Sequence, residues 1–182
     1  MRNYPNAAQG LYKVFLSQIL MIIGVLTAFI LIGGIVALVG QVLYLVGLYQ
    51  AKQDDEGYAG AFSLAIISLI VSFLGGFFGD SLMGNLFSLI SSILGFVILY
   101  LVCSTTALLV GSLGFDALAR QGYIVWMINL VCTIVSVICG ILQLVPVLNL
   151  LTIPVLLVTA IASLVGGVMF ILFVYRASKA LA

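Results

Sequence analysis

The stretch Val14–Ala51 reads VFLSQILMIIGVLTAFILIGGIVALVGQVLYLVGLYQA, and none of its 38 residues is Asp, Glu, Lys or Arg. A single α-helix of this length would be about 57 Å long at about 1.5 Å per residue. The hydrocarbon core of a bilayer is only about 30 Å thick. As a hairpin that turns at Gly33-Gly34, the stretch instead supplies two short spans of about 17–18 residues each. Whether it crosses a membrane once or twice decides the fold.

The composition of the whole chain is that of an integral membrane protein. Hydrophobic residues make up 65% of its 182 residues and charged residues only 6%, against about 45–50% and about 25% in soluble domains. Too few polar side chains exist to cover a water-facing surface, so soluble enzymes, nucleic-acid-binding proteins and disordered scaffolds are excluded. The net charge of +1 indicates neither a basic nor an acidic partner.

Three more runs lack an ionic residue: Gly57–Gly79, Ser81–Phe115 and Gln121–Tyr175. By their lengths the first crosses a membrane once and the last crosses it twice. The middle run predicts one span from about Gly84 to about Ser104, with a Ser/Thr/Gly-rich extension toward Arg120. The turn within the last run is predicted from its cluster of turn formers and polar residues: Gln143, Pro146, Asn149 and Pro154.

The positions of the charges favour two spans in the first run. With that hairpin, all basic residues fall on one side of the membrane: Arg2, Lys13, Lys52, Arg120, Arg176 and Lys179. The opposite side then carries only Asp80. A single first helix would divide the basic residues between the two sides. The positive-inside rule therefore favours six spans with both termini in the cytoplasm. Five spans with the N-terminus outside is the alternative.

We therefore predict an all-α fold, a polytopic transmembrane helical bundle that forms one domain over residues 1–182. Its six spans are expected as three hairpins at about 14–51, 59–111 and 122–176. The end of the first hairpin, ALVGQVLYLVGLYQAK from Ala37, resembles the end of the third, SLVGGVMFILFVYRASK from Ser163. This match suggests a hairpin repeat, and repeats are common in transporters.

The segment GLYQAKQDDEGYAGAF at Gly47–Phe62 and the N-terminal YPNAAQGL at Tyr4–Leu11 carry a family resemblance. Together they resemble a group of small bacterial multi-span membrane proteins with a GLYxAxxDDEGYxxAF segment. This chain has Gly33-Gly34 where that group has a proline in its first hairpin turn. The resemblance implies a bacterial origin and a plasma-membrane location. Because the group has no established activity, it transfers no functional residues.

The one cluster of charges is Asp54-Asp55-Glu56. As a structural feature, it would cap the helix that begins near Ala59, because acidic side chains accept from free backbone N–H groups at helix N-termini. As a functional feature, it would form, together with Tyr58, a docking site for a cytoplasmic protein or a weak divalent-cation site. We retain capping as the first hypothesis and docking as the second.

The sequence contains no recognisable catalytic machinery. Histidine, the commonest general base and a frequent metal ligand, is absent. No predicted span carries a charge in its interior, whereas ion-coupled pumps and proton relays depend on such residues. The cysteines all sit in apolar runs without companion ligands: Cys103, Cys132 and Cys139. We therefore predict a protein that is not an enzyme and has no cofactor or metal.

Weakly polar residues recur at helical spacing within the spans. The candidates for a polar path or a helix–helix seam are Ser88, Ser91, Asn129, Ser136 and Gln143. Small and weakly polar faces let transmembrane helices approach closely, which favours the seam. The alternative is a narrow path, or a pocket for an uncharged solute or a lipid.

We expect a non-catalytic membrane subunit or scaffold that engages a partner through its cytoplasmic loops, including Gly47–Tyr58. The partner would be a membrane or cytoplasmic protein, or a second copy in a homo-oligomer. The alternative function is a small transporter or channel for an uncharged solute or lipid. The composition requires the lipid bilayer as surroundings, and no nucleic-acid partner is expected.

Overall fold

The computed structural model describes residues 4–27, 32–79, 81–142 and 149–182, and within these ranges the chain forms six α-helices and no strand. The helices are α1 (Pro5–Leu26), α2 (Ile32–Ala51), α3 (Gly57–Phe78), α4 (Leu82–Ser112), α5 (Asp116–Leu142) and α6 (Asn149–Leu181). Each is long and apolar enough to cross a membrane. The predicted all-α bundle of six spans is therefore confirmed, and the first charge-free run supplies two helices rather than one.

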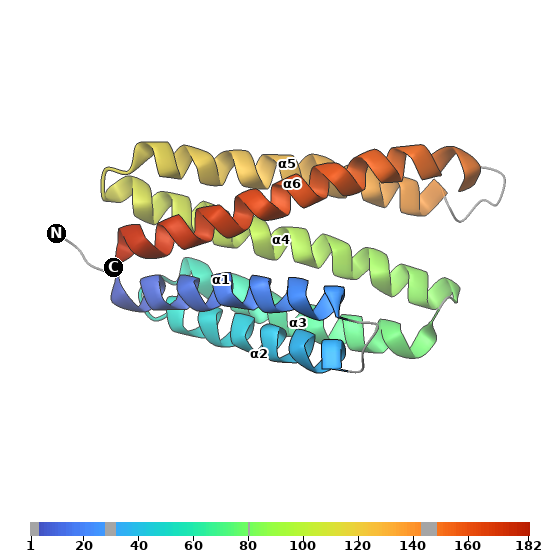
Figure 1. Ribbon diagram of the computed structural model, residues 1–182, viewed down its shortest axis with the longest axis horizontal. Helices are drawn as coiled ribbons and strands as arrows, with labels where there is room; N and C mark the ends of the chain where they lie inside the picture. The colour runs from blue at the N-terminus through green and yellow to red at the C-terminus, as the bar shows by residue number, and fades with distance from the viewer. Residues whose placement is uncertain (1–3, 28–31, 80, 143–148) are drawn as a thin grey trace.

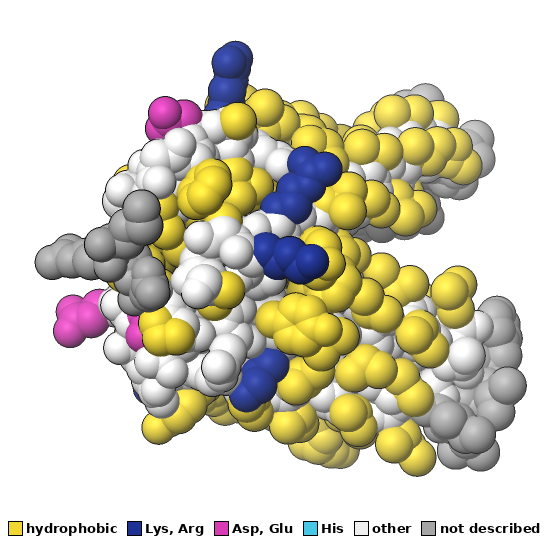
Figure 2. Space-filling model, turned by 60° about the vertical axis from the view of Figure 1, so that its left-hand side comes forward, with side chains coloured by type: hydrophobic (Ala, Val, Ile, Leu, Met, Phe, Trp, Pro, Cys, Tyr) yellow, Lys and Arg dark blue, Asp and Glu magenta, His cyan; other side chains and the backbone are white. Residues whose placement is uncertain are grey.

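The helices run alternately up and down along the long axis of the molecule (Figure 1). Each helix packs against the next one in sequence, and α1 also packs against α6. One end of the bundle, which we call the basic end, carries the Lys and Arg residues that the structure describes: Lys13, Lys52, Arg120, Arg176 and Lys179. Figure 2 shows basic side chains around this end, next to the apolar surface. The opposite end, where α1 is followed by α2, is the far end.

Packing is dense near the basic end and open near the far end. The core cluster joins the first and last helices with the middle of the chain and includes Leu11, Val14, Leu48, Tyr58, Val102, Val110, Phe173, Val174 and Leu181. Toward the far end, large apolar side chains are exposed, with Leu26 at 72%, Phe77 at 75% and Leu157 at 63%. In a membrane such side chains face lipid, whose tails are as apolar as a leucine side chain.

The predicted first turn at Gly33-Gly34 is wrong, because both glycines lie in the first turn of α2. Helix α1 has already ended at Leu26, and Thr27 follows as its C-cap. A Cβ atom on Gly24 would lie only 2.9 Å from the carbonyl oxygen of Gly33. Gly24 and Gly33 therefore allow α1 and α2 to pack closely, and Gly33 does not reverse the chain.

The backbones of α1 and α2 approach most closely near the basic end. A Cβ atom on Gly10 would lie 2.5 Å from the carbonyl oxygen of Gly47 and 2.7 Å from the backbone nitrogen of Ala51. A Cβ on Gly47 would in turn lie 2.7 Å from the carbonyl oxygen of Gly10. Only glycine fits at this reciprocal contact, which is how small residues join helices in lipid.

The predicted end of the fourth span is too early, since α4 continues past Ser104 to Ser112. The polar residues of this extension do not end the helix, because their hydroxyls bond to carbonyls of the same helix. Ser104 Oγ donates to Leu101 O at 3.2 Å, and Ser112 Oγ donates to Leu109 O at 2.7 Å.

The turn predicted in the last run is partly misplaced. Asn149 begins α6 and Pro154 lies inside it, so these two residues are not in the turn. Pro154 is past the four N–H groups at the helix start that lack a helical acceptor, so it removes one helical hydrogen bond; membrane helices tolerate such prolines. Gln143 and Pro146 lie outside the described residues.

The contact between Gly10 and Gly47 predicts that the stability of the protein falls when a side chain is added at either glycine. Gly10→Ala should lower the free energy of unfolding by about 1–3 kcal/mol, because a backbone must move to admit the new methyl group. The matched control is Gly34→Ala, since a Cβ there meets nothing within 4 Å. The control should be neutral or slightly stabilising, because alanine favours helix over glycine. Thermal unfolding in detergent measures both, and equal shifts would contradict the packing argument.

Candidate functional site

A pocket of about 180 Å³ lies among the first four helices, near the middle of each. Its lining residues are Gln18 and Met21 of α1, Gln41, Tyr44 and Leu45 of α2, Ala65 and Ser68 of α3, and Gly95 and Ile98 of α4. Two amides and two hydroxyls from three helices thus meet at one place, and no lining residue is ionic. Amides and hydroxyls both donate and accept hydrogen bonds, so the pocket suits an uncharged polar ligand.

The pocket is closed toward the basic end. One helical turn from its lining residues in that direction lie Val14, Leu48, Ala61 and Val102, all of them fully buried. One turn further, the hydroxyl of Tyr58 is paired with Thr106 Oγ1 at 2.7 Å, and both residues are fully buried. A small solute in the pocket has no route to the basic end in this conformation.

Nearer the far end, a separate groove of about 540 Å³ lies between α3 and α4. The groove is lined by Val71, Ser72, Gly75, Gly76, Gly79, Phe87, Ser88, Ser91 and Ser92. Ser72 lies one turn beyond Ser68 and Ser91 one turn beyond Gly95, so groove and pocket use the same helix faces. Ser72 Oγ and Ser91 Oγ are hydrogen-bonded at 2.8 Å between the two helices. Weakly polar residues therefore recur along one face of α3 and of α4 between the far end and the pocket.

The structure divides the predicted polar residues between two places. Ser88 and Ser91 line the groove between α3 and α4. Asn129 lies at the contact between α5 and α6, where a Cβ on Gly166 would be 3.0 Å from its Nδ2. That Nδ2 donates to Val125 O at 2.8 Å. Ser136 is half-buried on α5, and Gln143 lies outside the described residues.

Sequence reasoning missed the two glutamines of the pocket because it searched the spans for charges and for stripes of small residues. Gln18 and Gln41 both lie in the first charge-free run and stand out there as amides among apolar residues. They lie on different helices with no common periodicity, so only the packing of α1 against α2 brings them together. The signal that could have found them is the cost of placing any amide in a membrane span.

Two of the three carboxylates of the acidic cluster accept hydrogen bonds from other residues of the protein. The carboxylate of Asp54 accepts from Asn6 Nδ2 at 2.7 Å and from the backbone N–H of Ala7 at 2.8 Å. It therefore caps α1, and not the helix that follows it in sequence. Asp55 Oδ1 accepts from the backbone N–H of Gly57 at 2.7 Å, at the first turn of α3. Glu56 is exposed, and its side chain makes no capping bond.

Tyr58 differs from its predicted role at the docking site. Its side chain is fully buried and its hydroxyl is paired with Thr106, so a partner cannot reach it in this conformation. The tyrosine is the largest side chain in the core near the loop. It anchors the start of α3 to α4 instead of presenting a surface.

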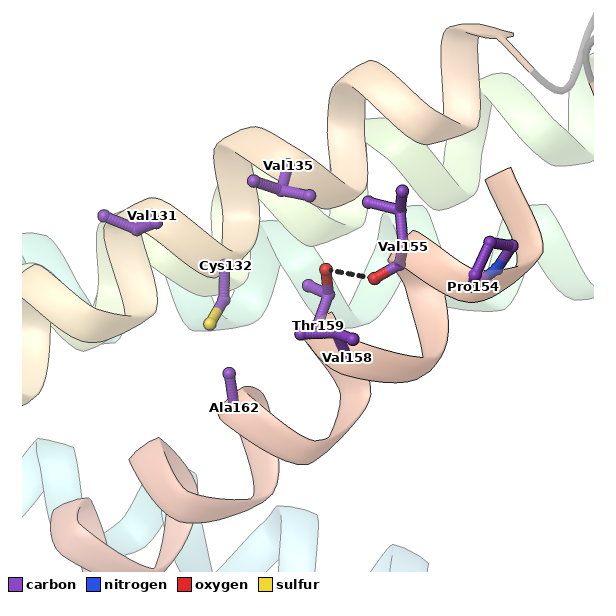
Figure 3. A pocket seen from close by; sticks show the side chains of 8 residues that line it. All are labelled: Val131, Cys132, Val135, Pro154, Val155, Val158, Thr159 and Ala162. Atoms are coloured by element: carbon purple, nitrogen blue, oxygen red, sulfur yellow. Dashed lines mark hydrogen bonds between the residues drawn. The ribbon is translucent and has the colours of Figure 1, made fainter. Parts of the chain in front are cut away.

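A second pocket, of about 520 Å³, opens between α5 and α6 and is almost wholly apolar (Figure 3). Its lining residues are Val131, Cys132, Val135, Pro154, Val155, Val158, Thr159 and Ala162. Its one hydroxyl is already used, because Thr159 Oγ1 donates to Val155 O at 2.8 Å. The pocket has the chemistry of the bilayer interior and carries no polar recognition group.

Comparison with known proteins finds no matching family, no similar curated protein and no similar solved structure. Among the residues that the structure describes, no three of His, Cys, Asp or Glu are grouped so that they could hold a metal ion. The features of the molecule that bear on its function are therefore the polar pocket, the acidic loop and the surface.

Because Asp54 caps α1, we predict that its removal destabilises the protein more than removal of Glu56. Asp54→Ala should lower the free energy of unfolding by about 0.5–2 kcal/mol, as loss of a helix cap does. Asp54→Asn should recover most of this, since an amide oxygen still accepts one bond. Glu56→Ala is the control and should stay within about 0.5 kcal/mol. Thermal unfolding gives the ranking, and a larger loss in Glu56→Ala than in Asp54→Ala would refute it.

Proposed function

We propose that this protein is a small transporter or channel for an uncharged polar solute, which it binds in the pocket among α1–α4. The observation that carries the proposal is the meeting of Gln18, Gln41, Tyr44 and Ser68 at one pocket. Polar groups are costly within a membrane and are retained there mainly for function or for bonding between helices.

The chemistry of the pocket limits the solute. No lining residue is ionic, so a charged solute would leave water without any compensating charge. Two amides and two hydroxyls offer both donors and acceptors to a neutral polar molecule. The volume of about 180 Å³ is well above the roughly 10–15 Å³ that a cavity needs to hold one water molecule. A compact molecule with several hydroxyl or amide groups fits these limits.

The direction of access follows from the closed layer and the charge distribution. We propose that the protein lies in a bacterial plasma membrane with the basic end and both termini in the cytoplasm, as the positive-inside rule favours. In this orientation the buried layer at Val14, Leu48, Ala61 and Val102 separates the pocket from the cytoplasm, which supports access from the outside. Release to the cytoplasm requires that this layer part.

The acidic loop supports a second proposal, in which the protein is a non-catalytic subunit or scaffold that binds another protein. Asp54 fastens the loop to α1, while the neighbouring Glu56 is exposed on it. A fixed loop with an exposed carboxylate costs little ordering entropy when a partner binds. The solute pocket remains the preferred proposal because three of the four predicted docking residues make internal bonds.

Cysteine labelling tests the solute route. In a variant without native cysteines, Ser72→Cys and Ser68→Cys should react with a small, hydrophilic, membrane-impermeant thiol reagent added from outside. Thiols react as thiolates, which form in water and not in lipid. We expect fast labelling at Ser72→Cys and slower labelling at Ser68→Cys, which lies deeper.

Two matched positions on the same helix control this experiment. Ala61→Cys lies within the closed layer, and Ile67→Cys replaces a side chain that is 47% exposed and would face lipid in the proposed membrane. Both should stay unlabelled. If Ser68→Cys is as unreactive as Ile67→Cys in folded protein, the pocket is dry and the transporter proposal fails.

The scaffold proposal has a separate test. The double variant Asp55→Asn with Glu56→Gln should abolish copurification of a partner from the native host in mild detergent. Its thermal stability should remain nearly unchanged, because Asp54 is untouched and the amide oxygen introduced by Asp55→Asn can still accept from the backbone N–H of Gly57. Copurification that persists in this variant would exclude the acidic loop as the docking site.

A further inference from the structure

A third pocket, of about 330 Å³, lies at the basic end between the start of α1 and the end of α6. It is lined by Ala8, Gln9, Tyr12, Lys13, Ser178, Lys179 and Ala182. Ala8 and Ser178 are each 5% exposed, so small side chains form its floor. The two lysines come from different helices. The pocket therefore combines two cationic side chains at its sides with small side chains at its base.

The cations of this pocket are held by neutral groups. Lys13 Nζ donates to Gln50 Oε1 at 2.6 Å, and Gln50 Nε2 donates to Gln9 Oε1 at 2.7 Å. Lys179 Nζ lies 4.9 Å from the ring centroid of Tyr175. Hydrogen bonds to amides and contacts with aromatic rings position an ammonium group without neutralising its charge. Both positive charges remain available to an anion.

The nearby carboxylate bonds to neutral groups and not to either lysine of the pocket. Asp54 is the acid closest in the fold to the start of α1, and its two oxygens accept from Asn6 and Ala7. Lys52 follows the same pattern, since it lies over the rings of Tyr49 and Phe62. Within the part of the chain that the structure describes, the contacts of Lys13, Lys52 and Lys179 are thus with an amide and with aromatic rings, and not with a carboxylate.

The surroundings of the pocket are those of a membrane interface. Tyr12 is 46% exposed, and Phe15 packs between Tyr12 and Tyr175 with ring centroids 6.0 Å and 4.9 Å apart. Tyrosine is enriched where a bilayer meets water. Figure 2 shows the basic side chains at the border between the polar end and the apolar sides of the molecule. A ligand in the pocket therefore has its charged part at the level of lipid headgroups.

Apolar surface continues from the pocket toward the far end. On α6, one helix face carries Lys179, Tyr175, Leu172 and Val168, at successive spacings of four, three and four residues. Leu172 is 44% exposed and Val168 is 50% exposed. On α1, Ile23 lies on the same face as Tyr12 and is 44% exposed. Figure 1 shows α1 and α6 together at the basic end and farther apart toward the far end. An acyl chain can lie along these faces while its headgroup stays in the pocket.

We propose that the pocket between α1 and α6 binds the phosphate headgroup of an anionic phospholipid of the inner leaflet, through Lys13 and Lys179. Gln9, Tyr12 and Ser178 stand around the same hollow and offer neutral hydrogen-bonding groups to the rest of the headgroup. The site shares no residue with the solute pocket among α1–α4, so it does not depend on the proposed transport.

The test is binding of defined lipids to the purified full chain in a neutral detergent, followed by native mass spectrometry and thermal unfolding. Phosphatidylglycerol should bind and raise the unfolding temperature, whereas phosphatidylcholine should do so much less. A lysine near an anionic headgroup contributes about a fivefold factor in affinity. Lys179→Gln should therefore weaken binding about fivefold, and the double variant with Lys13→Gln about thirtyfold.

The control variant is Lys52→Gln, which removes a cation from the same end but outside the pocket. It should leave phosphatidylglycerol binding within about twofold. Lys179→Arg should retain binding because it keeps the positive charge. If the double variant does not fold, the comparison of Lys179→Gln with Lys179→Arg still tests the role of this charge. The proposal is overturned if Lys52→Gln weakens binding as much as Lys179→Gln, because attraction would then be a property of the whole surface. It is equally overturned if inorganic phosphate alone gives the same stabilisation, since the pocket would then select a free anion and not a lipid.

Discussion

The close backbone contact between α1 and α2 is the feature on which the rest of the structure depends. In lipid, helices gain no hydrophobic driving force by associating, so contact has to come from short-range packing and hydrogen bonds. Gly10 and Gly47 allow this contact near the basic end, and Gly24 allows it near the far end. Gly40 adds a third point, where a Cβ would lie 3.1 Å from the carbonyl oxygen of Ser17. Because Ser17 and Gly40 each precede a glutamine, the same contact brings Gln18 and Gln41 to one pocket.

The same helix pair also organises the basic end. With α1 and α2 fixed side by side, the loop after α2 passes the start of α1, and Asp54 caps that helix through Asn6 and Ala7. Lys13 meets Gln50 across the two helices. An amide and not a carboxylate faces this lysine, so its charge stays available at the surface. One packing arrangement thus positions a solute pocket in the middle of the bundle and a cationic pocket at its end.

The two ends of the bundle differ in packing, and this difference gives the proposed functions a direction. Near the basic end, fully buried residues from all six helices close the interior: Leu11, Leu48, Tyr58, Val102, Val125 and Phe173 are examples, one from each helix. Near the far end, serines and glycines of α3 and α4 line an open groove. Local opening is cheapest where few apolar contacts are lost. The proposed transport would therefore admit a solute from the far end, and release at the basic end would require rearrangement of the dense core.

The sequence by itself determined that the protein is a helical membrane protein, favoured six spans over five and indicated that its basic residues gather at one end. These follow from run lengths and charge positions, which respond to bilayer thickness and to the positive-inside rule, and neither depends on how helices pack. The turn at Gly33-Gly34 and the roles of Asp54 and Tyr58 could not be obtained in this way. A glycine pair can serve a turn or a helix contact, and an aspartate can cap its own helix or another one. Only the tertiary structure decided that Gly33 packs against Gly24, that Asp54 caps α1 and that Tyr58 is buried against Thr106. It also joined Gln18 to Gln41 and Lys13 to Lys179, because the distances between residues far apart in the chain are set by packing and not by local sequence.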